Sequence, residues 1–168
     1  GATSPWSLDS SNRRAMPGHN ALSTTGAALS TSQVVPTDFE LYATAMAVGI
    51  EVECKVNISL NPGVGCVDTS IGSAIGSAVL VAKMLGLDKD GIVNSIGLAS
   101  LQAGSGFEFD GPWHFSKRNH YGWLGTQGIH GALQAQAGIM GAPHILEARY
   151  GFINQNSSKP NISIYDHL

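Results

Sequence analysis

One helix-compatible segment, Thr69–Leu87, constrains the fold of this chain more than any other part of the sequence. Its apolar residues recur every three or four positions, which places them on one side of an α-helix. These residues are Ile71, Ile75, Val79 and Ala82, and Gly72 and Gly76 stand one turn apart among them. Glycine costs helix propensity but lets a second backbone approach closely, so the segment predicts tightly packed helices.

The same segment is apolar enough to raise the question of a membrane span. Polar residues interrupt the run at Ser70, Ser73, Ser77 and Lys83. Its length is also marginal for crossing roughly 30 Å of hydrocarbon. We therefore expect a buried helix and no membrane insertion.

Composition indicates one folded domain over residues 1–168. Hydrophobic residues make up 43% of the chain and charged residues only 12%, which excludes intrinsic disorder. Lys and Arg number 9 against 12 Asp and Glu, so the basic surface of a nucleic-acid-binding protein is missing. We expect no nucleic-acid partner.

The first half of the chain divides into a lead-in and a series of helices. Residues 1–18 predict an irregular lead-in. Thr37, three positions before Glu40, predicts a capped helix start. The apolar stripe of that helix is Leu41, Ala45, Val48, Val52 and Val56. Asp88 predicts the cap of a later helix that ends before Gly104.

The second half begins with a polar, aromatic segment, residues 107–120, which predicts a loop. A long helix-compatible segment follows and carries Leu124, Ile129, Leu133 and Met140. We expect one more short helix at residues 143–150 and a loop or linker tail at residues 153–168. Since no segment has strand periodicity, the predicted fold class is all-α, an array of packed helical hairpins whose loops carry any site.

Common catalytic motifs do not supply a function. The six histidines form neither an HExxH motif nor a paired Cys/His spacing, so we expect no metal site. The patterns GxxxxGK[ST] and GxSxG are also missing. Cys54 and Cys66 form no CxxC motif, and we expect both to be reduced and buried. A cytoplasmic location is the expectation, with a mitochondrial one as the alternative.

Acids, bases and cations remain as the available chemistry. Asp9, His19, Lys117 and His120 fall in predicted loops just before helices, where a side chain reaches a cleft while the scaffold holds its backbone. The alternative for a loop histidine is a solvated or structural role. We favour that alternative for His114, His144 and His167. A Lys-Arg pair such as Lys117–Arg118 more often lies on a solvated surface than in an anion-binding site.

Several short segments together resemble the MmgE/PrpD family in both order and spacing. The segments are Val48–Val52, Ala82–Asp88, Ile96–Ala99 with Gly104, Ser116–Gly122, Gly128 with Ala132–Leu133, and Tyr150–Phe152. The resemblance extends from about Trp6 to Phe152. That family includes 2-methylcitrate dehydratases, cis-aconitate decarboxylases and an iminodisuccinate epimerase, so the resemblance implies small polycarboxylate substrates.

The resemblance also implies an architecture. Family members have a large helical domain and a smaller α+β lid domain, and they are longer than this chain. The sequence is therefore similar to a middle segment of the helical domain, with the lid absent. The resemblance implies no cofactor, and it implies association as a homo-oligomer, most simply a homodimer.

Six positions are candidates for catalysis or binding, and four of them follow from the resemblance. Asp9 falls on the first Asp of an Asp-rich active-site motif, although Ser11–Arg13 stand where Asp-Asp-Thr is usual. His19 falls on the His of a His-Pro-Gly segment, and Lys117 and His120 fall on the Lys and His of the substrate loop. Arg118 and Arg13 are candidates for binding substrate carboxylates. Val67 departs from the pattern, because another active-site His commonly stands there.

The functional prediction is a cofactor-independent lyase that dehydrates or decarboxylates citrate- or aconitate-type acids. A Lys stabilises the negative charge that develops in such reactions, and a His transfers the proton. Two alternatives stay open at this point. One is a non-catalytic helical module or an inactive fragment of such an enzyme, which Val67 favours. The other is an epimerase of the same family.

Overall fold

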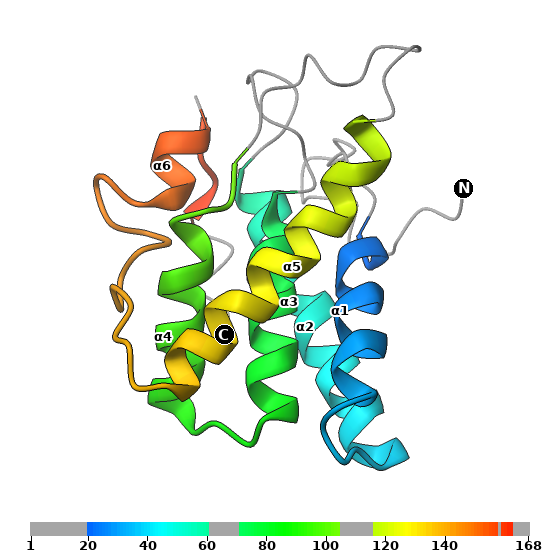
Figure 1. Ribbon diagram of the computed structural model, residues 1–168. Helices are drawn as coiled ribbons and strands as arrows, with labels where there is room; N and C mark the ends of the chain where they lie inside the picture. The colour runs from blue at the N-terminus through cyan, green and yellow to red at the C-terminus, as the bar shows by residue number, and fades with distance from the viewer. Residues whose placement is uncertain (1–19, 61–70, 105–115, 158, 163–168) are drawn as a thin grey trace.

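The computed structural model describes residues 20–60, 71–104, 116–157 and 159–162, including their side chains except those of residues 116 and 117. These residues form six α-helices and no strand, as Figure 1 shows, so the all-α prediction is confirmed. The helices are α1 (Leu22–Ser32), α2 (Phe39–Ser59), α3 (Gly72–Met84), α4 (Lys89–Ser100), α5 (Ser116–Gln136) and α6 (Phe152–Asn156). The predicted lead-in, residues 1–18, lies outside the described residues.

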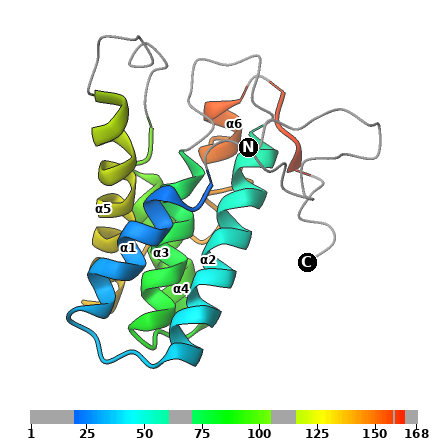
Figure 2. The same ribbon diagram turned by 90° about the vertical axis from the view of Figure 1, so that its right-hand side faces the viewer.

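Helix α3 is the centre of the bundle. Every residue of α3 except Lys83 is buried. Helices α1, α2, α4 and α5 all pack against it, as the two views in Figures 1 and 2 show. The buried helix predicted from residues 69–87 is thus confirmed for the part that is described. Within that part of the chain, no helix is long and apolar enough to cross a membrane.

Glycines set the spacing between α3 and its neighbours. A Cβ atom placed on Gly76 would lie 2.6 Å from the carbonyl oxygen of Gly49 on α2. A Cβ atom on Gly128 of α5 would lie 2.7 Å from the carbonyl oxygen of Ala74 on α3. Real Cβ atoms do not approach other atoms so closely, so a side chain at either position would push the helices apart. The close helix packing predicted from Gly72 and Gly76 is confirmed.

Aspartates cap α2 and α4. Asp88 Oδ1 accepts a hydrogen bond from the backbone N–H of Gly91 at 2.9 Å, as predicted for the start of α4. At the start of α2, the cap is Asp38, which accepts from the N–H of Leu41 at 2.8 Å. The predicted cap Thr37 instead donates to the carbonyl of Val35. A carboxylate also gains from the positive end of the helix dipole, which a hydroxyl does not.

Helix α5 is longer at its start and shorter at its end than the sequence predicts. It begins at Ser116, so the Lys117 and His120 positions expected in a loop belong to the beginning of the helix. The Lys-Arg pair has good helix propensity, which favours this extension. At the other end, Gly138 adopts φ 88° and stops the helix, which leaves Met140 outside it and 84% exposed.

The C-terminal segment differs from the prediction as well. Residues 143–150 form turns and no helix, whereas Phe152–Asn156 form the short helix α6. Phe152 and Ile153 are buried against Val56, Ile71 and Leu124. The expected loop or linker from residue 153 was therefore wrong for its first residues. These two side chains complete the core at one end of the bundle, which fixes the chain there.

The glycine contacts give a direct stability prediction. Gly76→Ala should lower the free energy of unfolding by about 2 kcal/mol, because its methyl group meets backbone atoms of α2. Gly26→Ala is the matched control on α1, where an added Cβ meets nothing within 4 Å. It should raise stability by about 0.5–1 kcal/mol through helix propensity. Urea unfolding of both variants measures the difference, and equal stabilities would contradict the close packing.

Candidate functional site

The starts of α1, α3 and α5 lie at the same end of the bundle, at the top of Figure 1, and the beginning of α5 extends beyond the other two. Along the chain, the predicted site residues either precede α1 or α3 or belong to the beginning of α5. Asp9, Arg13 and His19 precede α1, Val67 precedes α3, and Lys117, Arg118 and His120 belong to the beginning of α5. This end of the bundle is therefore the candidate functional site.

Glu53 on α2 is the central polar residue behind this end, and its side chain has no solvent exposure. Its Oε1 accepts a hydrogen bond from the N–H of Ala21 at 3.1 Å and from the hydroxyl of Ser73 at 2.5 Å. Its Oε2 accepts from the hydroxyl of Thr24. One carboxyl group thus binds the beginning of α1 and the beginning of α3.

Asn57, one turn further along α2, repeats this arrangement. It is also fully buried. Its Oδ1 accepts from the N–H of Gly72 at 3.0 Å, and its Nδ2 donates to Oδ1 of Asn20 at 2.7 Å. We refer to Glu53, Asn57 and their hydrogen-bond partners as the helix-start cluster. The cluster holds the starts of α1 and α3 against the last turns of α2.

Ala21 enters α1 in an unusual backbone conformation. Its φ is 73°, in the left-handed region, and it is the one described non-glycine residue with positive φ. This conformation costs an alanine roughly 1–2 kcal/mol. The hydrogen bond from its N–H to Glu53 compensates part of that cost. The strain lies two residues after His19, directly beside the candidate site.

Burial changes the acid–base properties of this region. It raises the pKa of Glu53 above the ordinary 4.5, and hydrogen bonds from Ser73, Thr24 and Ala21 oppose the increase. Burial, followed by the nearby charges of Glu53 and Glu51, raises the pKa of Cys54 to about 11. Cys54 is free and buried, as predicted, whereas Cys66 lies outside the described residues.

Two of the predicted site residues, Arg118 and His120, have described side chains, and both belong to the beginning of α5. His120 is 9% exposed, and its ring centroid lies 5.8 Å from that of Tyr121. Arg118 is exposed two residues earlier. The structure thus brings a guanidinium and an imidazole to the same end of one helix. The side chain of Lys117 and all of Asp9, Arg13, His19 and Val67 lie outside the described residues, so their roles stay predictions.

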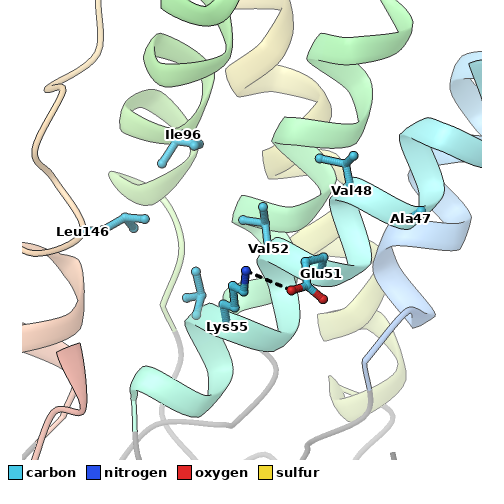
Figure 3. Close-up of a pocket in the computed structure, with 8 residues that line it drawn as sticks. Ala47, Val48, Glu51, Val52, Lys55, Ile96 and Leu146 are labelled. Atoms are coloured by element: carbon cyan, nitrogen blue, oxygen red, sulfur yellow. Dashed lines mark ion pairs between the residues drawn. The ribbon is translucent and has the colours of Figure 1, made fainter. Parts of the chain in front are cut away.

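Two of the grooves lined by described residues lie between different pairs of helices. The larger, about 670 Å³, runs between α2 and α4 and is closed by Leu146, as Figure 3 shows. An ion pair of 2.9 Å between Lys55 and Glu51 borders it. The smaller, about 200 Å³, lies between α1 and α5. Arg118 and His120 line neither groove, so neither hollow supports the predicted catalytic chemistry.

The apolar stripe predicted for α2 meets two different surroundings. Ala45 and Val56 are buried in the core, whereas Val48 is exposed and lines the larger groove together with Val52, which also packs against the core. The side of α2 that α3 approaches most closely carries Gly49, Glu53 and Asn57, one every fourth residue. A search for apolar residues in helical register does not detect a buried helix side that is formed by glycine and polar residues. The sequence does contain a feature that could have indicated this buried side, namely a glycine spaced at four-residue intervals from two polar residues.

Comparison with known protein families identifies the chain. The family model described as the MmgE/PrpD N-terminal domain matches residues 12–164. The chain belongs to the MmgE/PrpD family. A search of curated proteins finds no match. Of the predicted site residues, Arg13, His19, Lys117, Arg118 and His120 lie within the stretch that matches the MmgE/PrpD domain, and Asp9 lies before it.

The raised pKa of Glu53 predicts how stability depends on pH. Above about pH 4.5 the unfolded chain releases this proton, whereas the folded protein retains it until the pH reaches the raised pKa. The wild type should therefore lose stability relative to Glu53→Gln as the pH rises through this window. The loss is about 1.4 kcal/mol for each pH unit that separates the folded and unfolded pKa values. Urea unfolding across the window measures it, and an opposite trend would contradict the assignment.

Proposed function

We propose that this MmgE/PrpD protein is a cofactor-independent lyase that dehydrates or decarboxylates small citrate- or aconitate-type acids. The observation that carries the proposal is the family match over residues 12–164, which includes the positions that resemble the family's substrate loop. The common location of the three helix starts supports it, because Arg118 and His120 belong to the beginning of α5 and the other predicted site residues precede α1 along the chain or begin α5.

The electrostatics of this end suit a polyanionic substrate. Helix N-termini carry partial positive charge and unpaired N–H groups, which favour carboxylates. The guanidinium of Arg118 forms two parallel hydrogen bonds to one carboxylate of the substrate, a geometry that a lysine cannot reproduce. Arg13 is proposed to bind a second carboxylate.

Dehydration requires one base, one acid and one cation. In the proposed step, the imidazole of His19 or His120 removes a proton from the carbon next to a carboxylate. The electron pair forms the new C=C bond as the C–O bond breaks, and the departing hydroxide takes a proton from the other imidazole and leaves as water. The ammonium group of Lys117 stabilises the negative charge that develops on the carboxylate. Asp9 orients one of the two histidines.

Decarboxylation uses the same groups. The C–C bond to one carboxylate breaks, and carbon dioxide leaves. The electron pair that remains is delocalised toward the neighbouring unsaturated acid, where Lys117 stabilises it, and an imidazolium returns a proton to carbon. The two reactions differ in the bond that breaks and share this arrangement of charge.

The epimerase and the non-catalytic module remain the alternatives. An epimerase needs the same proton removal but returns the proton to the opposite face, without a leaving group. Val67, in place of a common family histidine, favours the non-catalytic alternative. Lys117 and His120, which match the family's substrate loop, favour catalysis.

Absorbance of the conjugated double bond of cis-aconitate tests the proposal in the full natural gene product. Lys117→Ala should reduce kcat by about 100- to 1,000-fold, as expected for loss of one charge-stabilising group. Lys89→Ala is the control, because Lys89 is an exposed lysine at the start of α4. It should leave kcat within about twofold of the wild type.

The outcome separates the three functions. No consumption of citrate- or aconitate-type acids by the wild type would reject the lyase. Incorporation of solvent deuterium without a change in absorbance would instead indicate the epimerase. Equal losses in Lys117→Ala and Lys89→Ala would reject the assigned role of Lys117.

We also propose that the partner is a second copy of this chain, joined through α1 and α5. Residues 20–37 and 119–146 contain no Asp, Glu, Lys or Arg, so a two-fold contact there meets no like-charge repulsion. Exposed apolar side chains stand on these two helices, namely Leu22, Leu29, Trp123 and Leu133. A surface of this composition favours a protein partner over water.

Analytical ultracentrifugation of matched variants tests this interface. Leu22→Glu places a charge at the α1–α5 groove and should convert the dimer into a monomer, since it introduces two like charges across the two-fold axis. Val48→Glu places the same charge at the α2–α4 groove and should leave the dimer intact. A monomeric wild type, or dissociation by Val48→Glu alone, would contradict the proposal.

A further inference from the structure

The helix-start cluster contains a buried carboxyl group that the proposed reaction does not use. Burying a carboxyl group costs free energy, and apolar side chains of similar volume often serve stability as well or better. Stability alone therefore gives a weak reason for a carboxyl group at Glu53. Its geometry indicates a second reason.

All the hydrogen bonds of Glu53 and Asn57 that cross to other elements go to the starts of α1 and α3. Glu53 accepts from Ala21, Thr24 and Ser73. Asn57 accepts from Gly72 and donates to Asn20. These bonds are directional, so they fix the axial position and the rotation of both helix starts, which apolar contacts alone do not.

The entry to α1 depends most on this carboxyl group. Ala21 is held in the left-handed region while its N–H donates to Glu53. One turn later, Thr24 donates its hydroxyl to the same carboxyl group and also lies against Gly49, where an added Cβ would be 3.3 Å from Thr24 Cγ2. Both contacts stand within five residues of His19 along the chain.

We infer that Glu53 is a positioning residue, which fixes the start of α1 against the start of α3 at the end of the bundle where the substrate is proposed to bind. The inference rests on the proposed lyase function. A misplacement of about 1 Å at a reacting group costs about 100-fold in rate. Loss of the carboxyl group should therefore lower kcat more than it changes KM.

Two substitutions at Glu53 separate positioning from stability. Glu53→Met keeps the volume and removes every acceptor, so it should fold with a lower melting temperature, because the buried donors Ala21, Thr24 and Ser73 lose their partner. The folded variant should lose about 10- to 100-fold in kcat. Glu53→Gln keeps one oxygen acceptor and the shape of the side chain. It should restore kcat to within about threefold of the wild type.

A serine pair on α3 provides a milder test that does not depend on the folding of Glu53→Met. Ser73 and Ser77 are one turn apart and fully buried. Ser73 donates to Glu53, whereas Ser77 Oγ has no hydrogen-bond partner among the described residues. Ser73→Ala should lower kcat about threefold to tenfold, and Ser77→Ala should leave it unchanged.

The same cis-aconitate assay of the full gene product decides between outcomes. Turnover by the wild type, with equal kcat in Ser73→Ala and Ser77→Ala, would overturn the positioning role and leave the lyase function intact. Full kcat in a folded Glu53→Met would do the same. Absence of turnover in the wild type would overturn the lyase function itself, and the positioning role with it.

Discussion

The close contact between α2 and α3 is the constraint on which the rest of this structure depends. The backbones meet at Gly49 and Gly76, where neither helix has room for a side chain. This spacing brings Glu53 and Asn57 within hydrogen-bonding distance of the start of α3. The same two residues then hold the start of α1. Small residues thus have two consequences here. They allow every residue of α3 except Lys83 to be buried, and they let polar groups determine where neighbouring helices begin.

This arrangement bears on where the proposed reaction can take place in a chain with few charges. The core between the helices is tightly packed, and the buried carboxyl group of Glu53 is bound there by hydrogen bonds. The beginning of a helix at the end of the bundle is a place where a charged side chain can reach a substrate. Arg118 and His120 stand at such a place, at the beginning of α5. The polar atoms of the helix-start cluster lie just behind it and are satisfied by one another. In the proposed site, the cluster provides rigidity, and the helix starts provide the groups that meet the substrate.

Sequence reasoning predicted the parts of the fold that depend on local patterns. The buried central helix, the cap at Asp88 and the all-α class follow from spacing and capping residues, and the family was suggested by a resemblance of several short segments. All were confirmed. Sequence reasoning failed where contacts between residues distant in the sequence determine the structure. Val48 belongs to the apolar stripe of α2 but is exposed in a groove, because α3 approaches α2 along Gly49, Glu53 and Asn57. Phe152 and Ile153 are buried in the core at the beginning of α6. Their contacts are with residues distant in the sequence, so no local pattern predicts this helix. Glu53 was missed for a related reason, since a carboxylate in a helix usually faces water.

The central claim is that a small polycarboxylate binds where α1, α3 and α5 begin. Titration of the full, ¹⁵N-labelled gene product with tricarballylate, a saturated tricarboxylate without a hydroxyl group to lose, tests this directly by NMR. The account predicts saturable chemical-shift changes concentrated at the amides of Asn20, Gly72 and His120. Changes confined to the turn between α3 and α4, at Gly86 and Leu87, or no saturable change at any amide, would contradict it.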